Sequence, residues 1–180
     1  MRNFNETSLL KQAKALQAQA QSAFGQACAW RTLSLASAAL PGTVQTLCEQ
    51  GQRLALDFVA KGKKDTDAIQ QVLSDLRALP ELDDDRVAAC AYVVGHLLSG
   101  QPEEVVWAAR RAYEATDQLA QQSISFTQYT PAIEMQLLGH TQVQAELERQ
   151  AIDLEQLKRE PGQSLAVILR AKENAGRGHV

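Results

Sequence analysis

Residues that favour β-strands are scarce in this sequence. Aromatic residues make up 5% of the 180 residues, and Val, Ile and Thr are outnumbered by Ala, Leu and Gln, which lose little entropy in a helix. We therefore predict an all-α protein and expect neither a doubly wound nor a β-sandwich fold. A chain of this length with 45% hydrophobic residues can bury one sizeable core. Residues 1–180 are expected to form a single-domain bundle of eight or nine helices.

Long hydrophobic runs are also missing. The first ten residues are polar and charged, unlike a signal peptide, and the most apolar window, residues 87–98, contains His96. A helix that crosses a bilayer needs about 20 apolar residues. We expect a soluble cytoplasmic protein without a membrane partner.

Cysteine is sparse and its spacing is uninformative. Cys28, Cys48 and Cys90 are an odd number, show no Cys-x-x-Cys spacing and lie among Ala, Leu or Val. This pattern is typical of buried, unreactive thiols in a reducing compartment.

Signatures of catalysis and of cofactor binding are absent. The sequence contains no P-loop, no Gly-x-Ser-x-Gly and no Gly-x-Gly-x-x-Gly motif. Its histidines, His96, His140 and His179, lie too far apart in the sequence for a shared metal-binding helix turn. We expect no cofactor, no metal and no catalytic residue, and therefore a protein that is not an enzyme.

Charge is balanced overall but uneven along the chain. The 18 basic and 21 acidic residues give −3, yet residues 65–160 contain 17 acidic and seven basic residues. Such a segment is a poor surface for nucleic acid, whose phosphates require Lys and Arg. It suits a basic protein partner; the alternative is a set of solvated helix faces that keep the protein soluble.

Two groups of residues are candidates for contact with a partner. The aspartates Asp83, Asp84 and Asp85 precede a helix expected at residues 86–98, where they would cap its N-terminus or meet a basic partner. They lack the spacing of a calcium loop. Phe126 and Tyr129 lie in an irregular segment, residues 121–130, where aromatic side chains either cover the core or form a binding surface.

The remaining pattern predicts how the helices are buried. Residues 7–22 are expected to form a peripheral helix, residues 24–40 the next one, and residues 174–180 a frayed tail. The helix at 86–98 is apolar nearly all round, which places it at the centre. Along residues 141–159 we expect the acidic side chains to face solvent: Glu146, Glu148, Asp153 and Glu155. Trp30 and Trp107 are expected in the core.

Several segments together resemble a known family. Residues 89–113 read ACAYVVGHLLSGQPEEVVWAARRAY, an apolar helix, a Gly-x-Pro turn and an Ala-rich helix, followed by Asp117. With the break at Leu40-Pro41 and the helix at residues 140–150, this pattern resembles the YjaG-like family of bacterial proteins of unknown function, domain-of-unknown-function family four-one-six. The resemblance implies an all-α bacterial cytoplasmic protein and transfers no catalytic residue. The Ala-rich helices and acidic surface are also similar, more weakly, to helical toxin-immunity proteins.

These observations lead to one functional hypothesis and two alternatives. We expect an immunity-type protein that binds and neutralises a basic bacterial toxin domain through Asp83, Asp84, Asp85, Phe126 and Tyr129. The first alternative is a small-molecule or weak enzymatic site inside the bundle that uses His96, Tyr92 and Tyr113. The second is a homodimeric scaffold.

Overall fold

The protein is all-α, as the composition predicts. The computed structural model describes residues 1–35, 39–126 and 128–177, and these residues form nine α-helices and two short 3-10 helices without a strand. The helices run as follows: α1 Glu6–Lys14, α2 Ala18–Ser34, α3 Gly42–Lys61, α4 Thr66–Arg77, η1 Pro80–Asp83, α5 Asp85–Ser99, α6 Pro102–Ser123, α7 Pro131–Leu138, α8 Thr141–Arg159, η2 Pro161–Gln163 and α9 Ser164–Arg177. Within these residues no helix combines the length and the apolar character that crossing a bilayer requires.

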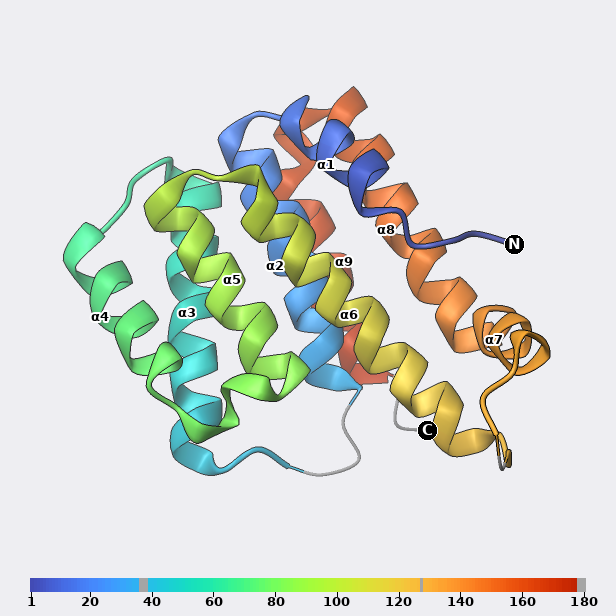
Figure 1. Ribbon diagram of the computed structural model, residues 1–180. Coiled ribbons are helices and arrows are strands. Elements are labelled where there is room, and N and C mark those ends of the chain that lie inside the picture. Colours follow the sequence, from blue (N-terminus) through green and yellow to red (C-terminus); the bar gives the residue numbers. More distant parts are fainter. Residues whose placement is uncertain (36–38, 127, 178–180) are drawn as a thin grey trace.

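Helix α2 is the element around which the others pack. It contacts α3, α5, α6, α8 and α9, and most of its residues are buried. In Figure 1, α3 and α5 lie to the left of α2, α6 passes in front of it, α9 lies behind it and α8 lies to its right, while α4 covers α3 and α5 from outside. The expected central position of the helix that begins near residue 86 is confirmed, since α5 is buried along most of its length.

Three apolar clusters lie within the described part of this framework. The first lies mainly between α3, α4 and α5, the second mainly between α1, α2, α6, α8 and α9, and the third between α6, α7 and α8. Burial of apolar surface at about 25 cal/mol per Å² makes these clusters the main source of stability. Gly51 lies where α3 crosses α5, and a Cβ there would lie only 2.8 Å from Val94 Cγ2, so the two helices approach closely.

The N-terminal helices begin and end at other residues than expected. The chain turns at residues 15–17, and residues 18–22 belong to buried α2 instead of a peripheral helix. The side chain of Gln21 explains the turn, because its Nε2 donates to the carbonyls of Ala13 and Leu16, both at 3.0 Å. The bond to Leu16 pairs a carbonyl just beyond the end of α1, and the bond to Ala13 adds to the one that its carbonyl accepts from the Leu16 N–H. At the other terminus α9 continues to Arg177, and residues 178–180 lie outside the described part of the chain.

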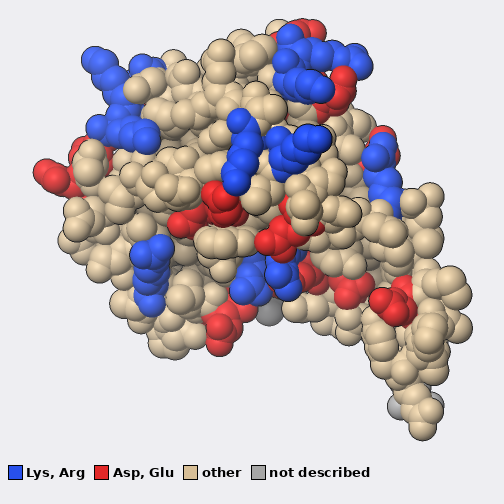
Figure 2. Space-filling view, turned by 45° about the horizontal axis from the view of Figure 1, so that its top comes forward, with Lys and Arg blue, Asp and Glu red and all other residues tan. Residues whose placement is uncertain are grey.

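The connection between α6 and α7 projects from the body of the molecule. Figure 2 shows basic and acidic side chains interspersed over the body, whereas the projection at the lower right carries no charge at its tip and acidic side chains near its base. We call residues 124–126 and 128–130 the aromatic projection, because they include Phe126 and Tyr129.

Candidate functional site

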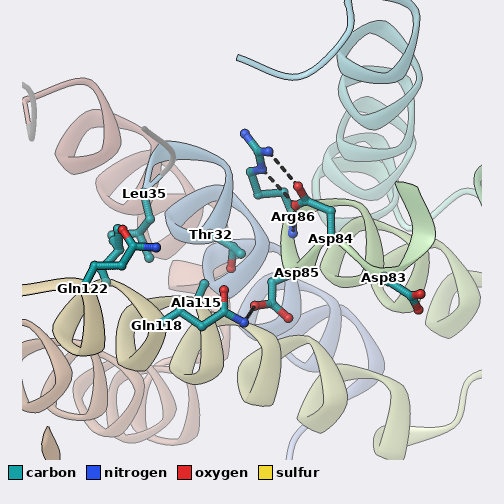
Figure 3. Close-up of a pocket in the computed structure, with 10 residues that line it drawn as sticks. Thr32, Leu35, Asp83, Asp84, Asp85, Arg86, Ala115, Gln118 and Gln122 are labelled. Carbon is teal, nitrogen blue, oxygen red and sulfur yellow. Dashed lines mark hydrogen bonds and ion pairs between the residues drawn. The ribbon is translucent and has the colours of Figure 1, made fainter. Parts of the chain in front are cut away.

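A cleft opens beside the three aspartates. It encloses about 210 Å³ between the C-terminal end of α2, the N-terminal end of α5 and the C-terminal half of α6 (Figure 3). Carboxylates and carboxamides dominate its wall, and Arg86 supplies one guanidinium. The lining residues are Thr32, Leu35, Asp83, Asp84, Asp85, Arg86, Ala115, Gln118, Leu119 and Gln122. We call this the acidic cleft.

Asp84 caps helix α5, as one of the sequence-based interpretations expects. Its carboxylate accepts from the backbone N–H of Arg86 at 2.9 Å and forms an ion pair with the Arg86 guanidinium at 2.6 Å. Hydrogen bonds from Arg86 hold the pKa of Asp84 below its ordinary value. The carboxylate is therefore ionised at neutral pH and already engaged within the chain.

Asp85 joins α5 to α6. It is buried, and its carboxylate accepts from Arg111 Nη1 at 3.1 Å and from Gln118 Nε2 at 3.2 Å. Burial raises the pKa of Asp85 despite the opposing effect of Arg111. Figure 3 shows Asp85 turned toward Gln118 on α6. This aspartate holds two helices together at the floor of the cleft.

Asp83 differs from its two neighbours. It is exposed at the end of η1, and among the described residues no hydrogen bond or ion pair to its side chain is found. Figure 3 places it apart from Asp84 and Asp85. Of the three aspartates expected to meet a partner, Asp83 is the one whose carboxylate is available.

The two aromatic residues singled out from the sequence contact each other. The rings of Phe126 and Tyr129 meet edge to face, with centroids 6.2 Å apart. Tyr129 is 61% exposed, and Met135 on the first turns of α7 is 62% exposed. A shallow hollow, lined in part by Ile124, Phe126 and Ile133, lies beside them. The aromatic projection thus presents apolar surface to solvent.

The acidic cleft and the aromatic projection lie at the same end of α6. The cleft extends along α6 to Gln122, and the projection begins after α6 ends at Ser123. Gln122 is therefore the cleft residue nearest in the chain to the projection, and Figure 3 places Asp83 at the opposite side of the cleft from Gln122.

The residues proposed for an internal site do not converge. His96 is buried, with Nδ1 3.0 Å from the Gln101 carbonyl. Tyr92 packs against Trp107, and Tyr113 stacks on Phe4. Tyr92 lines a cleft of about 200 Å³ in which neither His96 nor Tyr113 takes part.

The expected core position of the two tryptophans is wrong for Trp107. Its side chain lies at the surface of α6, 38% exposed, whereas Trp30 is half-buried. Trp107 covers Tyr92 from outside, at a centroid distance of 5.4 Å. A large ring can shield a neighbour in this way without entering the core itself.

A buried ionic cluster is the main feature that the sequence did not predict. Arg31 on α2 donates to Glu146 Oε2 at 2.8 Å and to Asp153 Oδ2 at 2.7 Å, both on α8. Arg170 on α9 pairs with the other oxygen of Asp153 at 2.7 Å. The prediction that Glu146 and Asp153 face solvent is wrong, because the guanidinium of Arg31 compensates their charge inside the bundle. A single arginine within an Ala-rich helix was the signal for this cluster.

Candidate metal ligands do not cluster in the part of the chain that the structure describes. No group of three or more His, Cys, Asp or Glu side chains in the described ranges could hold a metal ion. Comparison with protein-family models, curated proteins and solved structures finds no match for this chain. The resemblance to the YjaG-like family therefore stays a prediction.

Proposed function

We propose that this chain is a non-enzymatic immunity-type protein that binds and neutralises a basic bacterial toxin domain. The observation that carries the proposal is the aromatic projection, where Tyr129 stands 61% exposed and contacts Phe126 on a tip without charged side chains. Exposed aromatic residues that serve no packing role are typical of binding anchors. Their position beyond the end of α6 leaves them accessible to a partner.

The neighbouring acidic cleft supports the choice of a basic partner. Its wall contains three carboxylates against one guanidinium, and the carboxylate of Asp83 is available at its edge. Complementary charge steers association and suppresses wrong partners. In this proposal a Lys or Arg side chain of the toxin meets Asp83 while the toxin surface covers Phe126 and Tyr129.

The packing of His96 does not favour the alternative of an internal small-molecule site. Its ring is hydrogen-bonded to the Gln101 carbonyl and enclosed by the core, so that a ligand would have to displace these contacts. No observation of the structure singles out a homodimer either. The exposed aromatic pair therefore favours toxin binding over both alternatives.

The test is neutralisation in cells. Each open reading frame that neighbours this gene is induced separately in a laboratory bacterium, and a product that stops growth is co-expressed with this chain. We expect growth to be restored, and the purified pair to form a one-to-one complex with a nanomolar Kd by calorimetry. Persistent toxicity of every such product, or rescue without a complex, would overturn the proposal.

Matched variants locate the surface. Phe126→Ala combined with Tyr129→Ala is expected to abolish rescue. Leu169→Ala on α9 removes a side chain that is also apolar and 51% exposed, and it is expected to leave rescue intact. Equal rescue by both variants would place the toxin elsewhere on the molecule.

A further inference from the structure

A second cleft opens on the other side of Asp83. It encloses about 200 Å³ between the C-terminal end of α4, the 3-10 helix η1 and the helices α5 and α6. Asp83 lines both this cleft and the acidic cleft, and Figure 3 shows its carboxylate turned away from Asp84 and Asp85. Because Arg77 and Arg111 also line the second cleft, we call it the arginine cleft.

Small and apolar side chains give the arginine cleft its shape. Ala88 and Ala91 on α5 line it and leave the space open, since their side chains end at Cβ. Leu82 of η1 and the half-buried ring of Tyr92 complete the apolar lining. Trp107 supports the Tyr92 ring from outside, at a centroid distance of 5.4 Å. A cavity of about 150 Å³ can hold benzene, so this cleft has room for a ring and one small polar group.

Arg111 is held in position before any ligand arrives. Its Nη1 donates to Asp85 at 3.1 Å and to Glu114 at 3.2 Å, and Glu114 also accepts from Arg110. Both bonds of Arg111 start at the same nitrogen, whereas a guanidinium has five N–H donors. Nε and Nη2 therefore retain donors for another acceptor. A side chain that is already ordered loses little entropy when it binds one.

Arg77 supplies the second guanidinium of the cleft. It is exposed in the last turn of α4, and its side chain forms no hydrogen bond or ion pair within the described residues. Burial raises the pKa of Glu104 on α6, and the charge of Arg77 opposes this effect, yet the two side chains form no ion pair. Arg77 is therefore able to bind a ligand without giving up a bond inside the protein.

We propose that the arginine cleft binds a small monocarboxylate whose apolar body is about the size of a benzene ring. The carboxylate accepts hydrogen bonds from Arg77 and Arg111, and the body lies against Tyr92, Leu82 and the two alanines. Hydrogen bonds between a guanidinium and a carboxylate are shorter and stronger than those between neutral groups. The proposal goes beyond toxin binding and does not rest on it, because its ligand is not the toxin.

Asp83 limits which anions the arginine cleft accepts. Its carboxylate lines the cleft opposite to the sign of the two guanidiniums. Like charges at short distance repel each other, so a second negative charge on the ligand costs binding free energy. A ligand with one carboxylate and an otherwise uncharged body avoids this cost.

The experiment titrates the folded, isotope-labelled full chain with benzoate and follows the backbone amide signals by two-dimensional NMR. We expect saturable shifts of the Ala88, Ala91 and Tyr92 signals, with a Kd of about 1 mM or below. Benzamide has nearly the same shape without the charge, and it should bind about tenfold more weakly or worse. Equal binding of both probes, shifts confined to other parts of the chain, or no saturable shift with benzoate up to about 10 mM would overturn the proposal.

Two arginine variants test the source of the charge. Arg77→Gln removes a guanidinium without breaking a bond inside the protein, and it should weaken benzoate binding about tenfold. Arg53→Gln removes the same charge from an exposed arginine on α3 that does not line the cleft, and it should change the Kd by less than about twofold. Equal affinities of the two variants would sink the proposal. Arg111 is left in place because it also holds Asp85.

Asp83→Ala should act in the opposite direction. It removes the negative charge from the lining, so we expect the affinity for benzoate to rise several-fold and that for benzamide to stay the same. Asp83 is exposed, and its substitution leaves the core intact. A lower affinity of Asp83→Ala for benzoate would contradict a carboxylate bound beside this residue.

Discussion

At the scale of single residues, Arg31 is the side chain on which the buried charges depend most. Glu146 and Asp153 are 2% and 3% exposed, and Arg31 donates to both. Arg31→Met would leave Glu146 with a bond only from Gln150, while Asp153 keeps Arg170. Uncompensated buried charge costs about 3–5 kcal/mol. We expect the free energy of unfolding, measured with guanidinium, to fall by about 3 kcal/mol or more.

An exposed arginine provides the comparison for that measurement. Arg110 pairs with Glu114 at 2.8 Å, but the Arg110 side chain is 53% exposed. Exposed ion pairs contribute less than about 1 kcal/mol. Arg110→Met should therefore change stability far less than Arg31→Met, and equal losses would show that the buried cluster contributes no more than a surface pair.

His96 gives a pH dependence whose sign follows from its burial. Desolvation holds the pKa of His96 below its ordinary value of 6.5. Below that pH the unfolded chain binds the proton more readily than the folded protein, so the folded state loses stability as pH falls. His96→Gln removes this titration.

The measurement compares unfolding free energies of the two proteins between about pH 7.5 and 5. The wild-type protein should lose stability relative to His96→Gln by at most about 1.4 kcal/mol per pH unit. Asp85, whose pKa is raised, acts in the opposite direction, but it is present in both proteins and cancels. Parallel profiles would mean that folding does not lower the pKa of His96.

At the scale of helices, substitution of Ala for Gly51 and for Gly95 is expected to change the stability of the bundle in opposite directions. Ala is favoured over Gly inside a helix by about 1 kcal/mol. At Gly51 the new methyl would meet the buried Val94 at 2.8 Å, and such overpacking costs about 1–3 kcal/mol. At Gly95 the neighbour is the end of the flexible Glu104 side chain, 2.9 Å away, which can move aside.

We therefore expect Gly51→Ala to lower the thermal unfolding midpoint and Gly95→Ala to leave it unchanged or raise it. Differential scanning calorimetry of the two variants is the measurement. The pair controls for helix propensity, since both substitutions make the same change within an α-helix. A higher midpoint for Gly51→Ala would show that α3 and α5 separate easily.

Most helices could be predicted from the sequence, whereas contacts between distant helices could not. Helical periodicity and Pro or Gly breaks located most helices, and the cap formed by Asp84 followed from its position before an apolar helix. Periodicity treats a charged residue as outward, so it missed Glu146 and Asp153, whose partner Arg31 lies 115 positions or more away in the sequence. Phe126 and Tyr129 were selected because they are aromatic residues in a segment without helical periodicity. Their contact with each other could not be predicted, because the conformation of such a loop does not follow from a periodic pattern.

At the scale of the whole molecule, the proposed binding surface separates long-range charge from short-range contact. The carboxylates of the acidic cleft belong to the segment of residues 65–160, where acidic residues outnumber basic ones by 17 to seven, whereas the tip of the projection is uncharged. Long-range attraction acts on the rate of encounter and is screened by salt, while desolvated apolar anchors act on the rate of dissociation. The two parts of the surface should therefore be separable by kinetics.

For this reason Asp83→Ala and Tyr129→Ala are expected to weaken binding of the toxin in different ways. Asp83→Ala should slow association several-fold at low salt and flatten its salt dependence, with dissociation nearly unchanged. Tyr129→Ala should accelerate dissociation about tenfold or more and keep the salt dependence of association. Surface plasmon resonance at several salt concentrations measures both rates. Both side chains are exposed, so neither substitution should alter the unfolding free energy by more than about 0.5 kcal/mol. If Asp83→Ala leaves the association rate and its salt dependence unchanged, the acidic cleft does not steer the partner.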